Sequence, residues 1–195
     1  MNYIGSKKLE TENLILRSTE EKDLKVLWEI LCDVDVSKYY LVGKFNLDWE
    51  KEKEWQYKKL ARAGNQDVFQ WSIILKSTNE CIGQISCQKS YDTNGNLQDD
   101  NIRDVGWFLN SNYHNFGFGT EAAKAMLNYM FNEVGIDRIE TSSAVDNLAS
   151  WKLMEKLGFI RYTEKTHKTK YTFLIEEVDC YSYRITKEEY LSKRR

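Results

Sequence analysis

A short glycine-bearing segment has the residue types and the placement that could bind an anion. It runs from Tyr113 to Ala122, reads YHNFGFGTEA, and carries two glycines, Gly117 and Gly119. An apolar run at 105–109 precedes it and an amphipathic segment at 121–134 follows it, so a strand, a turn and a helix succeed one another. This order aims backbone N–H groups and a helix N-terminus at an anion, and glycine lets the backbone approach closely. A tight turn without any ligand is the alternative interpretation.

A second candidate segment follows one strand later. Residues 138–145 have the character of a strand, and the sequence VDNLASWKLMEKLGF at 145–159 begins a short helix at Asp146-Asn147 and ends it at Gly158. Strand, Gly-x-Gly turn, helix, parallel strand and a second helix start make a βαβα unit. The two candidate segments therefore belong to one supersecondary unit.

Periodicity elsewhere places this unit in a larger mixed sheet. Apolar and alternating runs predict seven strands, at 14–17, 69–75, 82–87, 105–109, 138–145, 159–163 and 178–185, the sixth continuing to 175 as strand or β-rich loop. Helices are predicted after a capping-box pattern at Ser18–Glu21, at 49–63, at 120–134 and from Asn147. Residues 33–46 are predicted to be a loop, 91–103 a solvated hairpin loop, and the chain from Lys187 a charged tail. The fold class predicted is mixed α/β.

The composition restricts the class of protein. The 195 residues, 42% hydrophobic and 30% charged, fit one globular domain spanning 1–195. The formal charge of -2 favours neither nucleic acid nor an anionic membrane, and no apolar run approaches the roughly 18 residues that cross a bilayer. Four cysteines without a Cys-x-x-Cys pair and only two histidines predict free thiols and no metal site. Because the N-terminal residues lack the apolar core of a signal peptide, we expect a cytoplasmic protein.

The two candidate segments together resemble the GNAT superfamily of acyl-CoA-dependent N-acetyltransferases. The family signature is a (Gln/Arg)-x-x-Gly-x-(Gly/Ala) turn after strand four and an Asn-x-x-(Ala/Ser) helix start after strand five, which closes with Gly-Phe. The motifs occur here as His114-x-x-Gly117-x-Gly119 and as Asn147-x-x-Ser150, closed by Gly158-Phe159. The residues at 120–122 and 155–159 are most similar to the branch of ribosomal-protein alanine and serine N-terminal acetyltransferases.

The resemblance, which covers Leu9 to Tyr190, implies the fold and the acetyl donor. It implies a GNAT fold with a mixed, mostly antiparallel seven-stranded sheet, in which the central parallel strands four and five splay apart, flanked by about four helices. It also implies that acetyl-CoA is the co-substrate. The residues that it assigns to coenzyme A are Phe108, Leu109 and Asn110 at the end of strand four, His114, Asn115, Phe116, Gly117, Phe118, Gly119 and Thr120 in the turn, and Asn147 and Ser150 on the next helix.

The resemblance further implies roles for some of these residues. In the family the edge backbone of strand four pairs with the pantetheine amides, the side chain at Asn147 bonds the pantetheine arm, and Ser150 lies where the departing thiolate is protonated. This sequence departs from the family pattern at His114, which replaces the usual Gln or Arg, and at Asn115 and Phe116, which replace small and basic residues. It also departs at Met154, which stands where many members have a tyrosine that acts as general acid. The proton for the thiolate must then come from Ser150 or from water.

Direct transfer also needs a base for the acceptor ammonium. Asp104, Glu140 and Asp146 are the candidates near strands four and five, and Asp104, at the entry of strand four, is the first choice. Each of them is alternatively a solvated charge at a strand end. Trp107 would border the acceptor site, and the Tyr39–Tyr40 pair would either form a wall over it or pack on the surface.

The acceptor itself stays open between two kinds of amine. The branch resemblance favours the N-terminus of a protein, and a small amine such as an antibiotic, a polyamine or an amino acid is the alternative. A module that binds coenzyme A without transferring acetyl groups is a third hypothesis, motivated by Met154 and by the unusual run at 114–116. A homodimer, which is common in the branch, is a further expectation, and no nucleic acid or membrane partner is expected.

Overall fold

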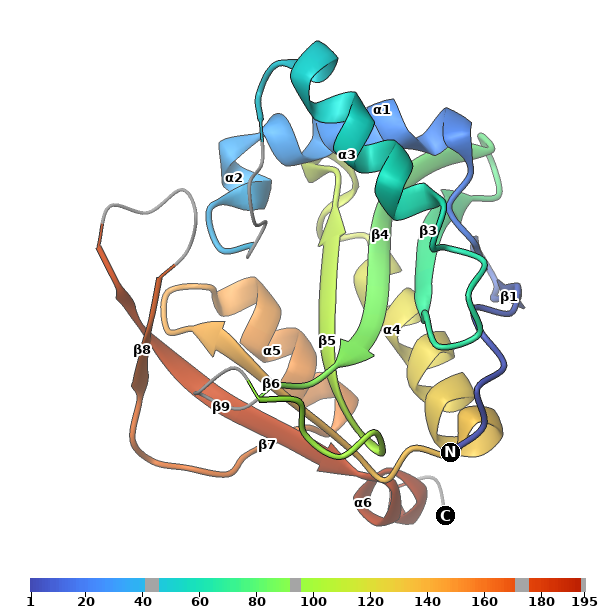
Figure 1. The fold of residues 1–195 in the computed structure, drawn as a ribbon. Coiled ribbons are helices and arrows are strands. Elements are labelled where there is room, and N and C mark those ends of the chain that lie inside the picture. The colour runs from blue at the N-terminus through green and yellow to red at the C-terminus, as the bar shows by residue number, and fades with distance from the viewer. Residues whose placement is uncertain (41–45, 92–95, 171–175, 194–195) are drawn as a thin grey trace.

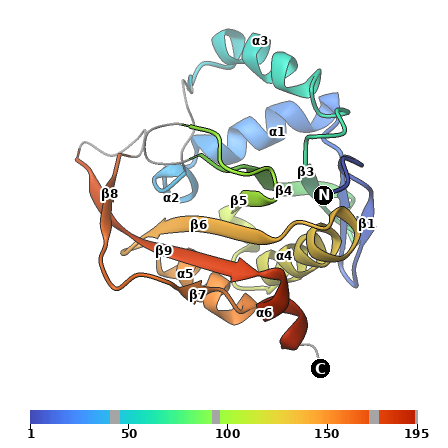
Figure 2. The same cartoon turned by 60° about the horizontal axis from the view of Figure 1, so that its bottom comes forward.

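The computed structural model describes residues 1–40, 46–91, 96–170 and 176–193. Its centre is a mixed sheet with helices on both faces (Figures 1 and 2). The strands of the described residues are β1 (Leu9–Glu10), β2 (Leu14–Arg17), β3 (Gln70–Leu75), β4 (Glu80–Lys89), β5 (Ile102–Leu109), β6 (Arg138–Ala144), β7 (Ile160–Arg161), β8 (His167–Thr169) and β9 (Val178–Thr186). The helices are α1 (Glu21–Cys32), α2 (Val34–Ser37), α3 (Trp49–Leu60), α4 (Phe118–Tyr129), α5 (Leu148–Leu157) and α6 (Lys187–Ser192), with a 3-10 turn η1 (Ser111–Tyr113) and a π-helical turn η2 (Met130–Val134).

The order of the strands confirms the mixed, mostly antiparallel topology. The sheet runs β1-β2-β3-β4-β5-β6-β9-β7, and β8 pairs with β9. Every neighbouring pair is antiparallel except β5 and β6. All seven predicted strands are present. The sheet has nine because the short β1 adds to β2 and because the predicted sixth strand is divided into β7 and β8.

The helices form two layers. Helices α1, α2 and α3 cover one face of the sheet and α4 and α5 the other, as Figure 2 shows. Helix α4 is central to the core, because Ala122, Ala123, Met126 and Leu127 are buried at helical spacing. The helix predicted at 120–134 is thus present as α4 and η2, and Gly135, with φ 77°, ends it in the left-handed conformation as predicted.

The charged tail predicted from Lys187 is wrong, since these residues form α6. Thr186 and Glu189 make a capping box in which each side chain binds the other residue's backbone N–H. Tyr190 is buried and stacks on Phe131 at a ring-centroid distance of 4.9 Å. A cap and one buried aromatic therefore hold a helix whose other residues are partly or fully exposed, half of its residues being charged.

The first helix begins later than its predicted capping box. The residue pair that caps α1 is Glu20 with Asp23, and the Asp23 carboxylate accepts from the Glu20 N–H at 2.8 Å. Asp23 is fixed there because Arg17 binds it through both terminal guanidinium nitrogens, Nη1 and Nη2, at 2.6 and 2.9 Å. Thr19, which lay inside the predicted box, is buried, and its hydroxyl is 3.1 Å from the Ser72 hydroxyl.

Arg103, predicted to lie in a solvated loop, is fully buried in β5. Its guanidinium lies over the Phe69 ring at 5.6 Å and places Nη2 3.2 Å from the Met1 Sδ. Within the described part of the chain, its Nε and Nη1 have no hydrogen-bond partner. The Asn94-Gly95 turn of the predicted hairpin lies outside the described residues.

Gly83 brings β4 closer to β5 than any side chain would allow. A Cβ at this position would lie 2.2 Å from the Phe108 carbonyl oxygen and 2.9 Å from the Leu109 Cα. We expect Gly83→Ala to destabilise the protein by about 1–3 kcal/mol, because β4 and β5 must move apart. Urea unfolding measures this loss. Gly64→Ala is the matched control, because a Cβ there meets nothing within 4 Å. Equal stability of the two variants would contradict the close approach.

Candidate active site

The two parallel strands part soon after they begin to pair. β5 and β6 are paired only at Ile102 with Arg138 and at Arg103 with Ile139. β5 continues to Leu109 and β6 to Ala144, so most of both strands runs unpaired on the facing sides (Figure 1). The splay predicted for these strands is therefore confirmed: towards their carboxyl ends the two strands no longer pair, and this gap in the backbone pairing is called the cleft below.

The ladder between β4 and β5 decides which backbone groups face this cleft. The Asn110 N–H binds the Ile82 carbonyl at 2.8 Å, which makes the opposed pair of Gly83 and Leu109 a non-hydrogen-bonded pair. The peptide groups of Leu109 must then point away from β4, towards β6. The same alternation directs those of Trp107 into the cleft.

This direction refines the predicted contacts with the pantetheine arm. Of the three residues predicted at the end of the strand, only Leu109 presents its backbone to the cleft. By the same alternation Phe108 faces β4, and the Asn110 side chain caps η1 by accepting from the Asn112 N–H at 3.0 Å. Trp107, predicted only to border the acceptor, contributes backbone groups as well. The sequence could have revealed this only through the strand register.

The glycine turn leads from η1 to the N-terminus of α4. Asn115 and Gly117 both have positive φ, 66° and 88°, and Gly117 is the N-cap residue of α4. A Cβ on Gly117 would meet nothing within 4 Å, so the backbone conformation, and not packing, requires glycine there. Gly119 differs, because a Cβ would make ordinary contacts with Leu109 and Leu153, at 3.5 and 3.7 Å.

Among the residues that the structure describes, no side chain caps the N-terminus of α4. Side-chain oxygens cap α3, α5 and α6, from Asp48, Asn147 and Thr186. In α4 the N–H groups of 118–120 precede the first intrahelical bond, which runs from the Glu121 N–H to the Gly117 carbonyl at 3.0 Å. The residues at 114–117 are exposed. The turn therefore presents free N–H groups and the positive end of a helix dipole to solvent, which suits an anion.

His114 does not extend towards this anion site through Nε2. That nitrogen lies 3.0 Å from the Leu109 carbonyl oxygen, and since a carbonyl only accepts, Nε2 carries the proton. The ring thus ties the end of β5 to the turn. Phe116 is 70% exposed, and its ring stacks on that of Phe118 at 5.9 Å.

The second motif lies across the cleft, at the N-terminus of α5. Asn147 caps this helix, its Oδ1 accepting from the Ser150 N–H at 3.3 Å, which leaves the Nδ2 donors for other partners. The Ser150 hydroxyl is half-buried, without a hydrogen bond to any described residue. Met154 is buried in the core, so this turn of α5 offers no proton donor at that position.

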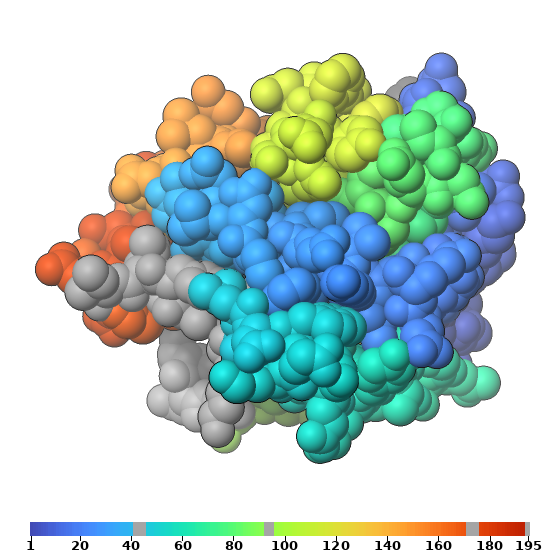
Figure 3. Space-filling view, turned by 90° about the horizontal axis from the view of Figure 1, so that it is seen from above, coloured from blue at the N-terminus to red at the C-terminus, as the bar shows by residue number. Residues whose placement is uncertain are grey.

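Figure 3 shows the same end of the molecule, with η1 in yellow-green next to α5 in orange and α2 in blue.

Asp104 lies on β5 where the two strands part, on the face covered by α1 and α2. Side chains alternate along a strand, and Phe108, on the same face, packs against Leu27 and Leu31 of α1. Asp104 is exposed by its accessible area, yet the protein atoms packed around its carboxylate partly desolvate it and raise the pKa of Asp104 to about 6. The nearby Thr141 hydroxyl and Val105 N–H partly oppose this rise. The group is therefore an ionised carboxylate at neutral pH with a raised proton affinity.

The other two candidate bases have ordinary surroundings. Glu140 forms an ion pair with Arg138 at 2.9 Å, and Asp146 is an exposed residue of the turn before α5. The described residues hold no group of three or more His, Cys, Asp or Glu side chains that could bind a metal. No helix in the described ranges has the length and apolarity to cross a membrane.

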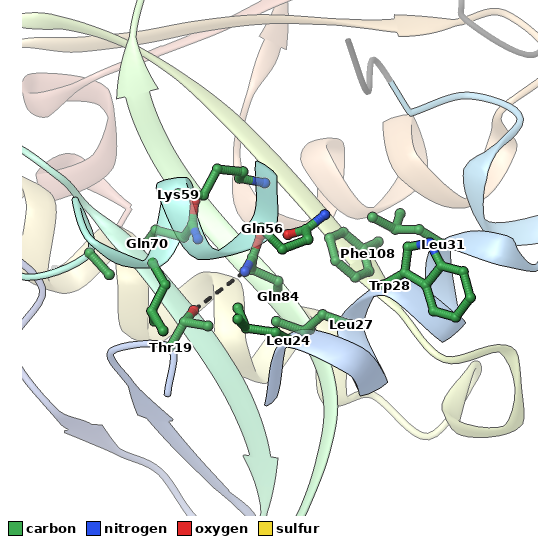
Figure 4. Close-up of a pocket in the computed structure, with 12 residues that line it drawn as sticks. Thr19, Leu24, Leu27, Trp28, Leu31, Gln56, Lys59, Gln70, Gln84 and Phe108 are labelled. Atoms are coloured by element: carbon green, nitrogen blue, oxygen red, sulfur yellow. Dashed lines mark hydrogen bonds between the residues drawn. The ribbon is translucent and has the colours of Figure 1, made fainter. Parts of the chain in front are cut away.

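A small cavity lies on the same face of the sheet, beneath α1 and α3 (Figure 4). Its volume is about 20 Å³, which is room for about one water molecule. Gln84 donates a hydrogen bond to the Thr19 hydroxyl within it at 3.4 Å, and Phe108 closes one side. An amine acceptor does not fit this space.

Comparison with known proteins bears on the family of the chain. The family model described as "Acetyltransferase (GNAT) domain" matches residues 13–160, which contain the cleft, the glycine turn and the start of α5. The chain belongs to the GNAT acetyltransferase family. It is 30% identical over 153 residues to the uncharacterized N-acetyltransferase YnaD of Bacillus subtilis (strain 168), covering 78% of this chain and 82% of that protein.

Solved structures agree with this GNAT assignment. The chain is similar to an acetyltransferase (GNAT family) from Bacillus anthracis, with a TM-score of 0.75 and 28% identity over 93% of this chain and 99% of that one. It shares its fold with the ribosomal-protein-S5-alanine acetyltransferase of Vibrio fischeri, at a TM-score of 0.74, 18% identity and coverage of 95% and 99%. It also shares its fold with the Vibrio cholerae spermidine N-acetyltransferase solved in complex with CoA and spermine. The TM-score is 0.73 and the identity 16%, over 93% of this chain and 99% of that one.

Proposed function

We propose that this GNAT protein transfers an acetyl group from acetyl-CoA directly to a primary amine. One observation carries the proposal: the unpaired edge of β5 leads straight to the uncapped N-terminus of α4. A strand edge that can bond amides and, next to it, an anion site match the two polar parts of coenzyme A, the pantetheine arm and the pyrophosphate.

The contacts of acetyl-CoA follow from these groups. The pyrophosphate would accept from the N–H groups of Phe118, Gly119 and Thr120, each charge-assisted bond being worth about 1.5–3 kcal/mol. The pantetheine amides would pair with the Trp107 backbone and with the Leu109 N–H, since the Leu109 carbonyl already accepts from His114, and Asn147 would donate from Nδ2. Phe116, exposed beside the turn, would contact the adenosine end.

The chemical step needs one proton acceptor and one proton donor. The Asp104 carboxylate would take a proton from the acceptor ammonium, since its raised pKa improves it as a base. The neutral amine would then attack the thioester carbonyl, forming the amide C–N bond and breaking the C–S bond. The CoA thiolate would take its proton from the Ser150 hydroxyl or from water, and that donor would regain a proton from the acylated nitrogen, which loses its second proton as the amide forms.

Ser150→Ala tests the proton donor. If the hydroxyl protonates the thiolate, kcat falls at least about tenfold, because general acid catalysis is lost, while the affinity for CoA stays unchanged. Steady-state thiol release gives kcat, and calorimetry gives the CoA affinity. Ser192→Ala on α6 is the control. An unchanged kcat in the Ser150 variant would assign the proton to water.

The acceptor class is tested by a panel of amines. The resemblance to N-terminal acetyltransferases favours peptides with a free N-terminus, and polyamines, aminoglycosides and amino acids represent the alternative. Thiol release from acetyl-CoA in the presence of each amine, followed by mass spectrometry of the product, ranks them. If calorimetry shows that CoA binds but no amine is acetylated, the protein is a CoA-binding module and not an enzyme.

A further inference from the structure

We propose that Tyr40 binds the ammonium group of the acceptor and, together with Asp104, selects primary amines that carry no carboxylate beside the amine. This inference rests on the proposed acetyl transfer and names the acceptor side of that site. The residue follows α2 and belongs to neither GNAT motif.

Tyr40 lies over the strand that carries the base. Its ring meets the Phe108 ring edge-on at a centroid distance of 5.1 Å. A Cβ built on Gly106 would be 3.8 Å from the Tyr40 ring and 3.9 Å from its hydroxyl oxygen, so the hydroxyl lies above Gly106. Asp104, Gly106 and Phe108 share one face of β5, because side chains alternate along a strand. The phenol is thus next to the base and next to the backbone that faces the cleft.

The neighbouring tyrosine fixes this position across the cleft. Tyr39 packs against Ala144 at the end of β6 and Cys180 on β9, whereas Tyr40 packs on β5 and α1. The Ser111 hydroxyl donates to the Asp33 carboxylate at 2.8 Å and ties η1 to the start of α2. The tyrosine pair therefore spans the two strands on the side opposite α5, where the acceptor must approach.

The chemistry of the Tyr40 side chain suits a cation. Its hydroxyl has no hydrogen bond to any residue in the described ranges, and burial raises the pKa of Tyr40 to about 12, so the group stays a neutral phenol. The phenol oxygen accepts from an ammonium N–H, and the aromatic ring attracts a cation. The negative charge of Asp104 adds to this attraction and opposes a carboxylate on the acceptor. An amino-acid acceptor is disfavoured for this reason, and the corresponding amide is favoured.

The experiment compares alaninamide with alanine in the wild-type enzyme and in two variants. We expect kcat/KM to be at least about tenfold higher for alaninamide than for alanine. Tyr40→Phe should raise the KM for alaninamide about tenfold, since a hydrogen bond to a charged group is lost, and Tyr40→Leu should raise it further. The KM for acetyl-CoA should stay within about twofold in both. Tyr57→Phe, which removes a hydroxyl bonded to Glu21 on the outer surface, is the matched control.

The possible results separate the two proposals. An unchanged KM for alaninamide in Tyr40→Phe, or a parallel rise in the KM for acetyl-CoA, would overturn the role of Tyr40. Equal kcat/KM for alanine and alaninamide would overturn the selection against carboxylates. If the wild type releases no thiol with any amine, acetyl transfer fails, and calorimetry of alaninamide with the CoA-saturated protein decides the inference. Binding lost in Tyr40→Phe supports the ammonium site, and no binding in the wild type refutes it.

Discussion

Asp104→Asn is expected to lower kcat/KM for the amine by about 10²- to 10⁴-fold, the range for loss of a general base. The asparagine keeps the size of the side chain but cannot take the ammonium proton. In the wild type, kcat/KM should rise as the pH passes the Asp104 pKa of about 6 and should then level off. The variant should not show this rise. Thiol release measured from pH 5 to 8 gives both results.

Asp146→Asn is the control for this substitution, because Asp146 is an exposed candidate base on the turn before α5. It should retain wild-type activity and its pH profile. If Asp104→Asn keeps its activity within about fivefold, the base is another group or a water molecule.

Asp104→Asn should also change the stability of the folded protein, in a direction that depends on pH. The pKa of Asp104 is raised in the folded state, so the native protein binds a proton more tightly than the unfolded chain does. The contribution of Asp104 to the free energy of unfolding is therefore fully present below the pKa of the unfolded chain, about 4. It is lost as the pH rises through the folded pKa of about 6. Asparagine avoids this loss. Above pH 6 the variant should unfold at a higher temperature than the wild type, and at pH 4 the two should agree.

Gly117→Asp should weaken CoA binding by about 100-fold or more. Aspartate tolerates the left-handed conformation better than most residues, so the turn can keep its shape. Its carboxylate would then lie at the uncapped N-terminus of α4, where it takes the N–H groups and repels the pyrophosphate, each lost bond costing about 1.5–3 kcal/mol. Calorimetric titration with CoA measures the change.

Gly117→Asn distinguishes charge from shape, because asparagine has the same size and also accepts positive φ. It should bind CoA more tightly than the aspartate variant, and the difference between them should shrink with added salt. Equal, wild-type affinities in both variants would place the pyrophosphate elsewhere.

The sequence was sufficient for two local features of the candidate site. Gly117 could be recognised because a positive φ and a helix start are local properties, and Asn147 because a helix cap lies three residues from its partner. The direction of the Trp107 and Leu109 peptide groups could not be predicted, since it depends on the register of β5 with β4. Long-range packing also hid the burial of Arg103. α6 was missed for a different reason: its charged composition concealed a local capping box and a single buried tyrosine.

The gap between β5 and β6 gives this sheet an edge in its own interior. Strand edges normally lie at the periphery, where charges, bulges or covering loops prevent pairing with other chains. Here α5 lies on one side of the exposed edge and the Tyr39–Tyr40 pair on the other. Coenzyme A would take the place of the missing strand partner, so each bound molecule would also shield the protein from association through β5 and stabilise the native state by mass action.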